Sequence, residues 1–487
     1  MDTLRLVRRL DQLWVVLGLL LLAVAVRWQT FANPVLGFDE QFYLLVGDQM
    51  VAHHALPYVD VFDRKPIGLF LIFAGARLLG GDGFVQYKLV ALGFVVLTAY
   101  LIYRAALPIS SRFAALVAAA LSVIWLNFME GEGGQAEVFY NPLMLGAALI
   151  VWHVFQNRRN IGVNGALAML LVGVALQIKY TVIFEGIFFG LALIWGHYST
   201  HRRVLALLPL GLVWIVCAWL PTALAALVYW RLGALQPFAF ANFLSLFGRN
   251  AEPFSSEMVG LIQISGVLLP LALPAFFARN ALWAQEKFAL CWLIAALVGM
   301  IVFGSFLSPQ YAMPLVAPLC LATAPFFARR GRGVVVGVAM VVSAFGASQV
   351  VLAHVMVNKG GAQAAREVAA AAQPHPGHCI YVYDGYPALY MLTHSCLPTR
   401  WVFPGHLNTQ VESSARALGV DPIAEEKRIL ASRPETIIDD APVFSGGNRA
   451  THALVLSALA HDYHLVLKYR TGHDRYRLVY RLNNAAL

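Results

Sequence analysis

Charged side chains are scarce in this chain of 487 residues: only 13% are Asp, Glu, Lys or Arg, whereas 59% are hydrophobic. Soluble domains carry about 25% charged residues, and the mean hydropathy of +0.67 also lies outside their range. This composition excludes an ordinary soluble protein and predicts a polytopic membrane protein. The net charge of +9 comes from basic residues dispersed in pairs between apolar runs, a distribution that argues against a nucleic-acid partner.

Several sequence signatures are also absent. The sequence has no Walker loop, Rossmann glycine fingerprint, zinc-protease motif or nucleophile elbow, which argues against ATP-driven transport and a nucleotide-bound donor. It has no long-period repeat or low-complexity tract, so a solenoid is not expected.

Cysteines are few, and their positions form two groups. Cys217, Cys291 and Cys320 fall within long apolar runs, whereas Cys379 and Cys396 lie in the polar C-terminal part. Cysteines in an oxidising compartment commonly pair. A disulfide between Cys379 and Cys396 is therefore favoured over two free thiols.

Apolar runs long enough to cross a bilayer are abundant, and they predict about eleven spanning helices. We expect these over residues 12–30, 84–103, 112–128, 138–155, 162–178, 181–197, 204–229, 258–278, 288–306, 310–328 and 333–354. We interpret the first as an uncleaved signal anchor, because no small-residue cleavage site follows it.

Successive spans cross the membrane in opposite directions, and the basic residues of the connecting loops then all fall on one side of it. They are Arg5, Arg8, Arg9, Arg104, Arg112, Arg158, Arg159, Arg202, Arg203, Arg279, Lys287, Arg329, Arg330 and Arg332. The positive-inside rule makes that side cytoplasmic. We therefore expect a multi-pass protein of the bacterial inner membrane, with its acidic clusters and C-terminal part in the periplasm.

The composition changes at about residue 356, where polar residues, prolines and glycines increase and no window is long enough to span. We expect a transmembrane domain over residues 1–355 and a soluble periplasmic α/β domain over 356–487. In the second domain we expect strands at 379–383 and 436–438, helices at 422–432 and 450–461, and a hairpin at 463–482.

Two charged clusters stand out in the first extracytoplasmic loop. They are Phe38-Asp39-Glu40-Gln41-Phe42-Tyr43 and Asp60-Val61-Phe62-Asp63-Arg64-Lys65-Pro66. An amphipathic stretch separates them, and the apolar segment 67–79 is short for a bilayer span. Since charge kept at a membrane surface usually does chemistry or holds a head group, we interpret the loop as a shallow active site lying on the membrane.

The clusters suit acid–base chemistry on a lipid phosphate. A carboxylate beside a hydrophobic groove can take a proton from an acceptor hydroxyl or amine, and Asp39 is the first candidate and Glu40 the second. Arg64 and Lys65 can neutralise a phosphate whose lipid tail lies in the membrane. Asp63 is a candidate for an acceptor or metal contact.

The order of features in the membrane half resembles the GT-C membrane glycosyltransferases. The first span is followed by Asp-Glu with a tyrosine soon after, an interfacial helix, Asp-Arg-Lys-Pro and a second interfacial helix. Within the GT-C enzymes, this order is similar to the protein mannosyltransferase and aminoarabinose transferase superfamily. Gly134-Gln135-Ala136-Glu137 and Pro309-Gln310-Tyr311-Ala312-Met313-Pro314 also resemble luminal signatures of that family. The likeness covers about 350 residues, which form the membrane half of the chain. The motifs of the first loop are specific to the family, whereas the later matches are loose.

This resemblance implies a GT-C fold and an inverting transfer of one sugar, a hexose or pentose, from a polyprenyl-phosphate donor. It implies that Asp39 is the base, Glu40 its acidic neighbour and Lys65 the lysine facing the donor phosphate. The tyrosine that follows Asp-Glu is Tyr43, an acceptor or metal candidate. No cofactor is certain, although a divalent metal fits the chemistry. The chain has fewer spans than larger members and a different soluble domain, which favours a lipid-linked glycan, lipopolysaccharide or surface polysaccharide over protein as acceptor.

Structural explanations remain open for each candidate. Asp39 and Glu40 suit a helix N-terminus, Arg64 and Lys65 could snorkel into head groups, and the adjacent His53 and His54 are more typical of a solvated pair than of a metal site. Glu137 is either an acceptor or metal contact or a helix-terminal acid. Lys179 and Tyr311 are either donor-phosphate contacts or interfacial anchors.

A lipid or sugar transporter is the alternative function. Transporters more often have paired half-repeats, broken helices and ionisable residues near the bilayer midplane, whereas the expected spans are nearly free of central charge. The sequence therefore favours an enzyme whose partners are a polyprenyl-phosphate sugar, a glycan or lipid acceptor, and membrane lipids.

Overall fold

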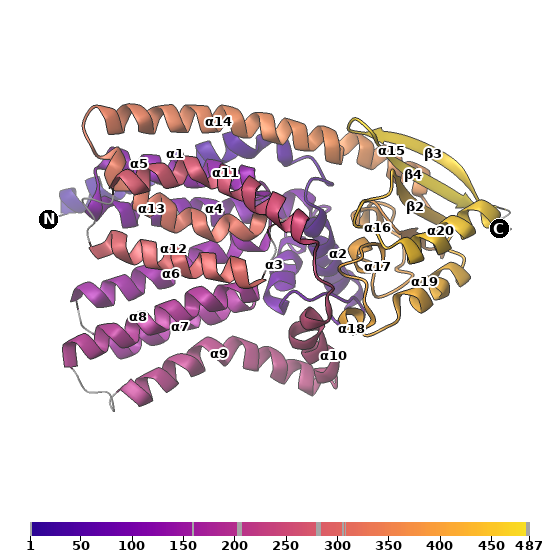
Figure 1. Ribbon diagram of the computed structural model, residues 1–487, viewed down its shortest axis with the longest axis horizontal. Helices are drawn as coiled ribbons and strands as arrows, with labels where there is room; N and C mark the ends of the chain where they lie inside the picture. Colours follow the sequence, from indigo (N-terminus) through magenta and orange to yellow (C-terminus); the bar gives the residue numbers. More distant parts are fainter. Residues whose placement is uncertain are drawn as a thin grey trace. The chain divides into compact units, whose positions relative to one another are not determined.

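The computed structural model describes residues 2–157, 160–201, 207–278, 284–303, 306 and 308–483. The chain forms two compact units (Figure 1). Unit 1 comprises Met1–Trp28, Lys88–Ala225 and Pro253–Leu352, and unit 2 comprises Gln29–Tyr87, Ala226–Glu252 and Ala353–Leu487. Of the loop arginines in the topology argument, Arg158, Arg159, Arg202, Arg203 and Arg279 lie outside the described residues, as do the side chains of Arg5, Arg8 and Arg9.

Unit 1 contains the long apolar helices, each in full or for most of its length. They are α1 (Asp2–Arg27), α4 (Phe84–Ala106), α5 (Arg112–Trp125), α6 (Ala136–Asn157), α7 (Ile161–Leu176), α8 (Ile183–His201), α9 (Leu207–Arg231), α11 (Phe254–Ala278), α12 (Ala284–Phe303), α13 (Val316–Phe327) and α14 (Arg332–Lys359). Short turns of 3-10 helix accompany them at η1 (Trp28–Thr30), η2 (Leu107–Ile109), η3 (Leu126–Met129), η4 (Tyr180–Val182) and η8 (Pro309–Leu315).

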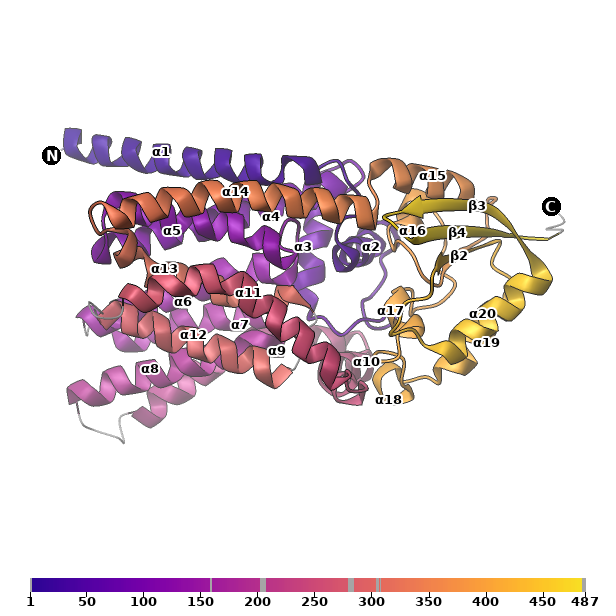
Figure 2. The same cartoon turned by 45° about the horizontal axis from the view of Figure 1, so that its top comes forward.

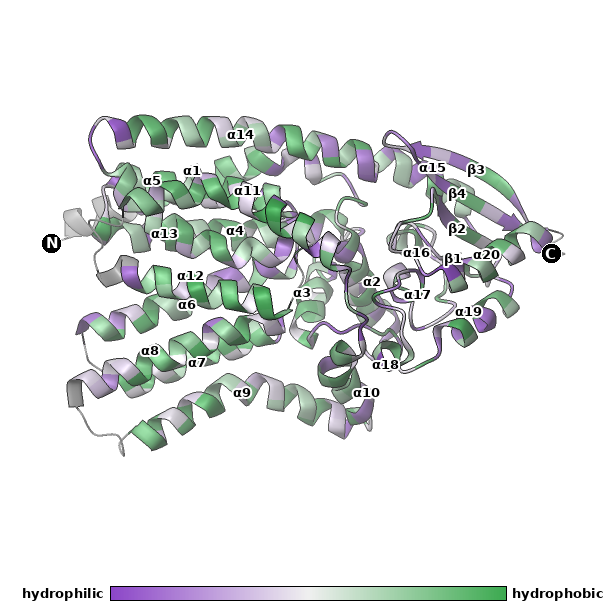
Figure 3. Cartoon of the chain, in the orientation of Figure 1, coloured by the Kyte–Doolittle hydropathy of each residue, from purple (hydrophilic) through white to green (hydrophobic). Residues whose placement is uncertain are grey.

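Each of the eleven expected spans corresponds to a helix of the described chain. Nine of these helices are long and apolar enough to cross a membrane, with η8 and α13 together forming one of them. The other two, α7 and the described apolar part of α12 (Lys287–Phe303), are apolar but shorter. Figure 3 shows hydrophobic residues along the helices of unit 1. The prediction of a polytopic helical membrane protein is confirmed.

Small residues allow close packing within unit 1. Helix α6 packs against α7 and α8, and α13 packs against α5 and α11. At Gly173 of α7, an added Cβ atom would lie 2.5 Å from the carbonyl oxygen of Ala218 in α9. A larger residue at this position would force the two helices apart.

Unit 2 contains shorter helices and a sheet. Its helices are α2 (Phe38–His53), α3 (Ile67–Arg77), α10 (Leu235–Ala239), the π-helical η5 (Phe240–Leu244), η6 (Ser245–Gly248), α15 (Ala362–Ala372), α16 (Leu389–Leu392), α17 (Pro404–Asn408), α18 (Ala415–Leu418), α19 (Pro422–Ala431) and α20 (Arg449–Asp462). Its strands are β1 (Ile380–Val382), β2 (Thr436–Ala441), β3 (Tyr463–Thr471) and β4 (Arg475–Leu482).

Helices α2 and α3, with 16 and 11 residues, lie at the positions of the two expected interfacial helices. They pack closely at Gly47, where an added Cβ atom would lie 2.7 Å from the backbone nitrogen of Ala74. Glycine therefore fixes the spacing between the helix that follows the first span and the helix that follows Pro66.

The four strands have the order β1-β2-β4-β3, and Figure 2 shows β2, β4 and β3 side by side. Strand β1 runs parallel to β2, and the other neighbouring strands are antiparallel. The hairpin turns at Gly472, whose φ of 65° is readily adopted only by glycine. Helix α15 packs on β3 and β4, and α19 packs against α20. This part of unit 2 has the expected α/β composition.

Candidate functional site

The first turn of α2 places two adjacent carboxylates in different surroundings. The side chain of Glu40 is buried, and its Oε2 accepts a 3.0 Å hydrogen bond from the hydroxyl of Tyr87. Asp39 is only half-buried. The N-cap residue of α2 is Gly37, which has no side chain to cap the helix.

The second cluster lies in the loop just before α3. Asp63 is buried, and its Oδ1 accepts a 2.7 Å hydrogen bond from the backbone nitrogen of Arg64. Burial raises the pKa of Asp63, while the positive charges of Lys65 and Arg64 act in the opposite direction. Asp63 Oδ2 is buried and without a hydrogen-bond partner among the described residues.

Arg64 is held by partners from elsewhere in unit 2. Its Nε donates a 2.6 Å hydrogen bond to Ser245 Oγ, and its guanidinium forms an ion pair with Glu412. Burial lowers the pKa of Arg64, and the charges of Glu412 and Asp63 oppose that shift. These contacts fix the loop to the C-terminal part of the chain, and a donor-phosphate role for Arg64 stays a prediction.

Lys65 is half-buried beside an aromatic ring. Its Nζ lies 5.6 Å from the ring centroid of Tyr43, a buried residue of α2. The Tyr58 hydroxyl donates a 2.8 Å hydrogen bond to the carbonyl of Lys65. Both the backbone and the ammonium group of Lys65 are thereby positioned within the loop.

His406 joins this cluster from α17, more than three hundred positions away in the sequence. Its Nε2 lies 4.0 Å from Asp63 Oδ1, and its ring packs against Phe42, Phe62 and Phe403. Burial, with the charges of Arg64 and Lys65, lowers the pKa of His406 well below its usual value. The sequence did not indicate this residue as a candidate. Phe403-Pro404-Gly405-His406 carries no catalytic or binding motif, and it lies far from the first loop in the sequence.

Unit 1 holds the remaining candidates in one cluster. Lys179 forms an ion pair with Glu137, and both side chains are buried. Lys179 Nζ also lies 3.6 Å from the ring centroid of Tyr311. Snorkelling requires a charged group that reaches the head groups, so the buried pair argues against it. Ionisable residues buried within a membrane domain are costly and usually functional.

The candidates therefore form two groups. Asp39, Glu40, Tyr43, Asp63, Arg64 and Lys65 belong to unit 2, and Glu137, Lys179 and Tyr311 belong to unit 1. Across the described chain, no group of three or more His, Cys, Asp or Glu side chains could hold a metal ion. His53 and His54 accordingly do not belong to such a group.

Solved structures with a similar fold are GT-C membrane glycosyltransferases. ArnT from Cupriavidus metallidurans in the apo state matches with a TM-score of 0.62 and 16% identity, over 96% of this chain and 97% of that chain. ArnT from the same organism bound to undecaprenyl phosphate matches with a TM-score of 0.60 and 16% identity, over 97% and 98%.

The arabinofuranosyltransferase AftD from Mycobacteria matches with a TM-score of 0.51 and 15% identity, over 98% of this chain but 40% of that chain. No protein-family model and no curated protein sequence matches the chain. At these identities the likeness shows the fold, and the chain has the GT-C fold expected from its first loop.

Proposed function

We propose that the protein is an inverting glycosyltransferase that moves one sugar from a polyprenyl-phosphate donor to a glycan or lipid acceptor. The observation that carries this proposal is the half-buried carboxylate of Asp39 at the start of α2, in the same unit as Lys65. The GT-C fold supports it, as does the fact that one similar structure, ArnT, is bound to undecaprenyl phosphate. The acceptor side is the periplasmic face of the inner membrane.

The proposed chemistry uses few groups. Asp39 takes the proton from the acceptor hydroxyl, and the acceptor oxygen forms a bond to the anomeric carbon of the donor sugar. The bond between that carbon and the phosphate oxygen breaks, and its electron pair leaves with the polyprenyl phosphate. Lys65 stabilises the negative charge that this phosphate gains. Attack opposite the leaving group inverts the anomeric centre.

The base is tested by Asp39→Asn, which keeps the size of the side chain and removes its proton affinity. Mass spectrometry of surface glycans and polyprenyl-phosphate sugars is compared in a deletion strain carrying wild-type or variant protein. We expect a missing sugar, accumulated donor, and turnover reduced roughly a hundredfold or more. Asp474→Asn, at an exposed position in the β3–β4 turn, is the matched control. Normal glycans with a normally expressed Asp39→Asn protein would exclude this base and favour Glu40 or Glu137.

A transporter remains the second candidate because of the buried Glu137–Lys179 ion pair, since such residues often mark substrate pathways in membranes. The two functions differ in the fate of the donor. A glycosyltransferase releases polyprenyl phosphate without its sugar, whereas a transporter moves the donor intact. Purified protein in proteoliposomes, supplied with polyprenyl-phosphate sugar and a cell-envelope acceptor extract, distinguishes them by the presence of free polyprenyl phosphate.

A further inference from the structure

A groove of about 830 Å³ lies in unit 1 among α6, α8, α9 and α12. Helix α8 packs against both α6 and α12 (Figure 1). The residues that α6, α9 and α12 contribute all lie near one end of their helix, and they are Trp152, Phe155, Leu207, Lys287, Phe288 and Cys291. The positive-inside rule places these helix ends on the cytoplasmic side. The groove is therefore distinct from the candidate cluster of unit 1, because Glu137 lies at the other end of α6.

The wall of the groove is a cluster of aromatic rings centred on Phe288. The ring centroid of Phe288 lies 5.3 Å from that of Phe188, 5.7 Å from that of Trp152 and 6.3 Å from that of Phe155. Ring pairs at these distances attract one another beyond the effect of burial alone. The cluster thus joins α6, α8 and α12 and holds the wall in one arrangement, which lowers the entropic cost of binding a ligand.

The groove follows α8 over the depth of one bilayer leaflet. Its lining residues on this helix extend over ten positions, from Phe188 to Tyr198, which is a rise of about 15 Å. The hydrocarbon core of a bilayer is about 30 Å thick, so that one leaflet contributes about 15 Å. Between them, Leu191 and Trp195 also line the groove and are 59% and 64% exposed. Because α8 is long and apolar enough to span the membrane, this exposed apolar surface faces lipid.

The polar residues of the groove lie at its cytoplasmic mouth. Tyr198 is in the last turn of α8 and Lys287 in the first turn of α12, and both are exposed. Lys287 is the one charged residue among the described residues that line the groove. Lysine and tyrosine at the end of a span typically reach the level of the lipid head groups. The groove therefore offers a cation for a head-group phosphate and an apolar wall for a lipid chain.

We propose that this groove binds one phospholipid of the cytoplasmic leaflet, with its phosphate at Lys287 and an acyl chain against the aromatic wall. Surrounding lipid tails are as apolar as the groove. The preference for the groove therefore comes from van der Waals packing against its wall and from the ammonium–phosphate pair. The bound lipid holds the cytoplasmic ends of α6, α8 and α12 together. This proposal does not depend on the proposed glycosyltransferase function.

The test is native mass spectrometry of the delipidated full-length protein in detergent. The protein is titrated with phosphatidylglycerol, or with a diacylglycerol that has the same acyl chains and no phosphate. We expect one tightly bound phosphatidylglycerol and weaker binding of the diacylglycerol, because only the first lipid can pair with Lys287.

Two variants separate the contributions of the mouth and the wall. Lys287→Gln removes the cation at an exposed position, and it should weaken the binding of phosphatidylglycerol roughly threefold, as expected for an exposed ion pair. Ala192→Phe adds a ring at a buried position that lines the groove. It should reduce the binding of both lipids, because the added ring occupies the space of the acyl chain.

Arg330→Gln is the matched control, because Arg330 is exposed between α13 and α14 on the same predicted side and does not line the groove. It should bind phosphatidylglycerol as wild type does. Equal affinity of wild type for the two lipids, or unchanged binding by Lys287→Gln, would overturn the proposal even if Ala192→Phe does not fold. Complete displacement of phosphatidylglycerol by equimolar undecaprenyl phosphate would assign the groove to that lipid and would also overturn it.

Photo-cross-linking locates the bound lipid. Phosphatidylglycerol with a diazirine in its acyl chain is irradiated with the protein at a low ratio of lipid to protein, and the labelled peptides are identified by mass spectrometry. We expect more labelling of the groove segments of α6, α8 and α12 than of the exposed face of α9 at Leu220 and Leu224. Equal labelling of all these helices would show an unselective lipid annulus only and would refute the site.

Discussion

At the scale of single residues, Asp39 and Glu40 are neighbours with different structural roles. Glu40 is buried and bonded to the Tyr87 hydroxyl, which fixes the start of α2. Asp39 has a half-buried side chain, and an acceptor can approach it without first displacing a buried partner. A general base must come within hydrogen-bond reach of the proton it abstracts. Asp39 fits that requirement better than Glu40.

Lys65 provides the second residue-scale prediction. Replacing it by Met preserves the apolar stem and removes the charge that would face the donor phosphate. We expect a higher apparent KM for polyprenyl-phosphate sugar and a lower kcat, because the phosphate gains charge as it leaves. Donor titration of purified wild type and Lys65→Met in the same lipid measures both constants.

The matched control is Lys427→Met, at an exposed position of α19, which should leave donor kinetics unchanged. If Lys65 only anchors the loop at the interface, Lys65→Met would lower thermal stability and leave both constants intact. That result would remove Lys65 from the site.

Glu426 gives a prediction about pH. Its side chain is buried in α19 and accepts a 2.8 Å hydrogen bond from the Tyr381 hydroxyl. Burial raises the pKa of Glu426 to about 8, although the bond from Tyr381 opposes the shift. A raised carboxyl pKa means that stability is fully present below the unfolded pKa and is lost as the pH rises through about 8.

We therefore expect Glu426→Gln, which resembles the protonated acid, to raise Tm relative to wild type at pH 9 and to change it little at about pH 4, below the pKa of an unfolded glutamate. Thermal unfolding of both proteins at the two pH values measures this difference. A Tm difference that is the same at both pH values would show that the charge of Glu426 is not its source.

At the scale of elements, hydropathy and short motifs predicted most of the architecture. Helices α2 and α3 occur where two interfacial helices were expected, and the hairpin follows from Gly472. The expected amphipathic pattern is not found in α2, because Glu40 to Gly47 are all buried; a position at the membrane interface stays a prediction. Boundaries were less accurate. Helix α14 continues to Lys359, beyond the expected end at residue 354, because Val355, Met356 and Val357 continue the apolar run. The helix ends before Gly360, whose φ of 89° is typical of a residue that follows a helix.

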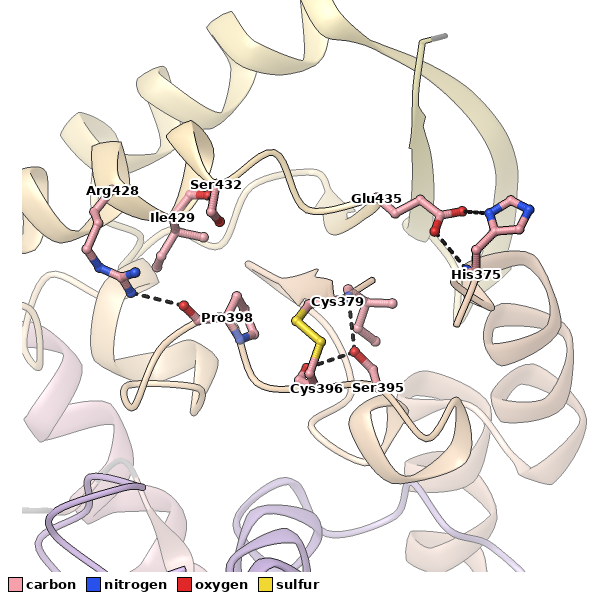
Figure 4. The surroundings of a disulfide bond; sticks show 10 residues. His375, Cys379, Ser395, Cys396, Pro398, Arg428, Ile429, Ser432 and Glu435 are labelled. Carbon is pink, nitrogen blue, oxygen red and sulfur yellow. Dashed lines mark hydrogen bonds and ion pairs between the residues drawn. A yellow bond between two sulfur atoms is a disulfide. The ribbon is translucent and has the colours of Figure 1, made fainter. Parts of the chain in front are cut away.

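The disulfide gives an element-scale prediction. Cys379 and Cys396 are bonded in the structure (Figure 4), which confirms the favoured pairing, and they are 17 residues apart. A cross-link of this loop length contributes about 3 kcal/mol to stability. The double variant Cys379→Ser with Cys396→Ser should lose about that free energy of unfolding, measured by denaturation in the same detergent.

Thiol labelling checks the bond itself. In unreduced, denatured protein, only the free cysteines Cys217, Cys291 and Cys320 should react. All five should react after reduction. Stoichiometric labelling of Cys379 or Cys396 without reductant would contradict the disulfide.

At the scale of the whole molecule, the sequence could not predict which distant residues meet. His406 lies beside Asp63, and Lys179 pairs with Glu137, although neither pairing leaves a local pattern. The sequence offered Glu137 and Lys179 as separate candidates with separate structural explanations. Such contacts depend on tertiary packing, which no hydropathy window or short motif describes.

The topology is a property of the whole chain, and it depends on two short helices. Between residues 160 and 420, the described chain has seven apolar helices or helix combinations that could cross the membrane: α7, α8, α9, α11, α12, α13 with η8, and α14. An odd number of crossings places residues 160 and 420 on opposite sides of the membrane. The positive-inside rule predicts residue 160 in the cytoplasm and residue 420 in the periplasm.

Reporter fusions at residues 160, 233 and 420 test this arrangement. We expect a cytoplasmic reporter at 160 and periplasmic reporters at 233 and 420, because α7, α8 and α9 separate the first two positions. If α7 does not cross, 160 and 233 fall on the same side. If α12 alone does not cross, 233 keeps its side relative to 160 and 420 changes. The fusion at 233 therefore reveals which short helix fails, and either failure would place the C-terminal strands on the face opposite to Asp39 instead of on the same face.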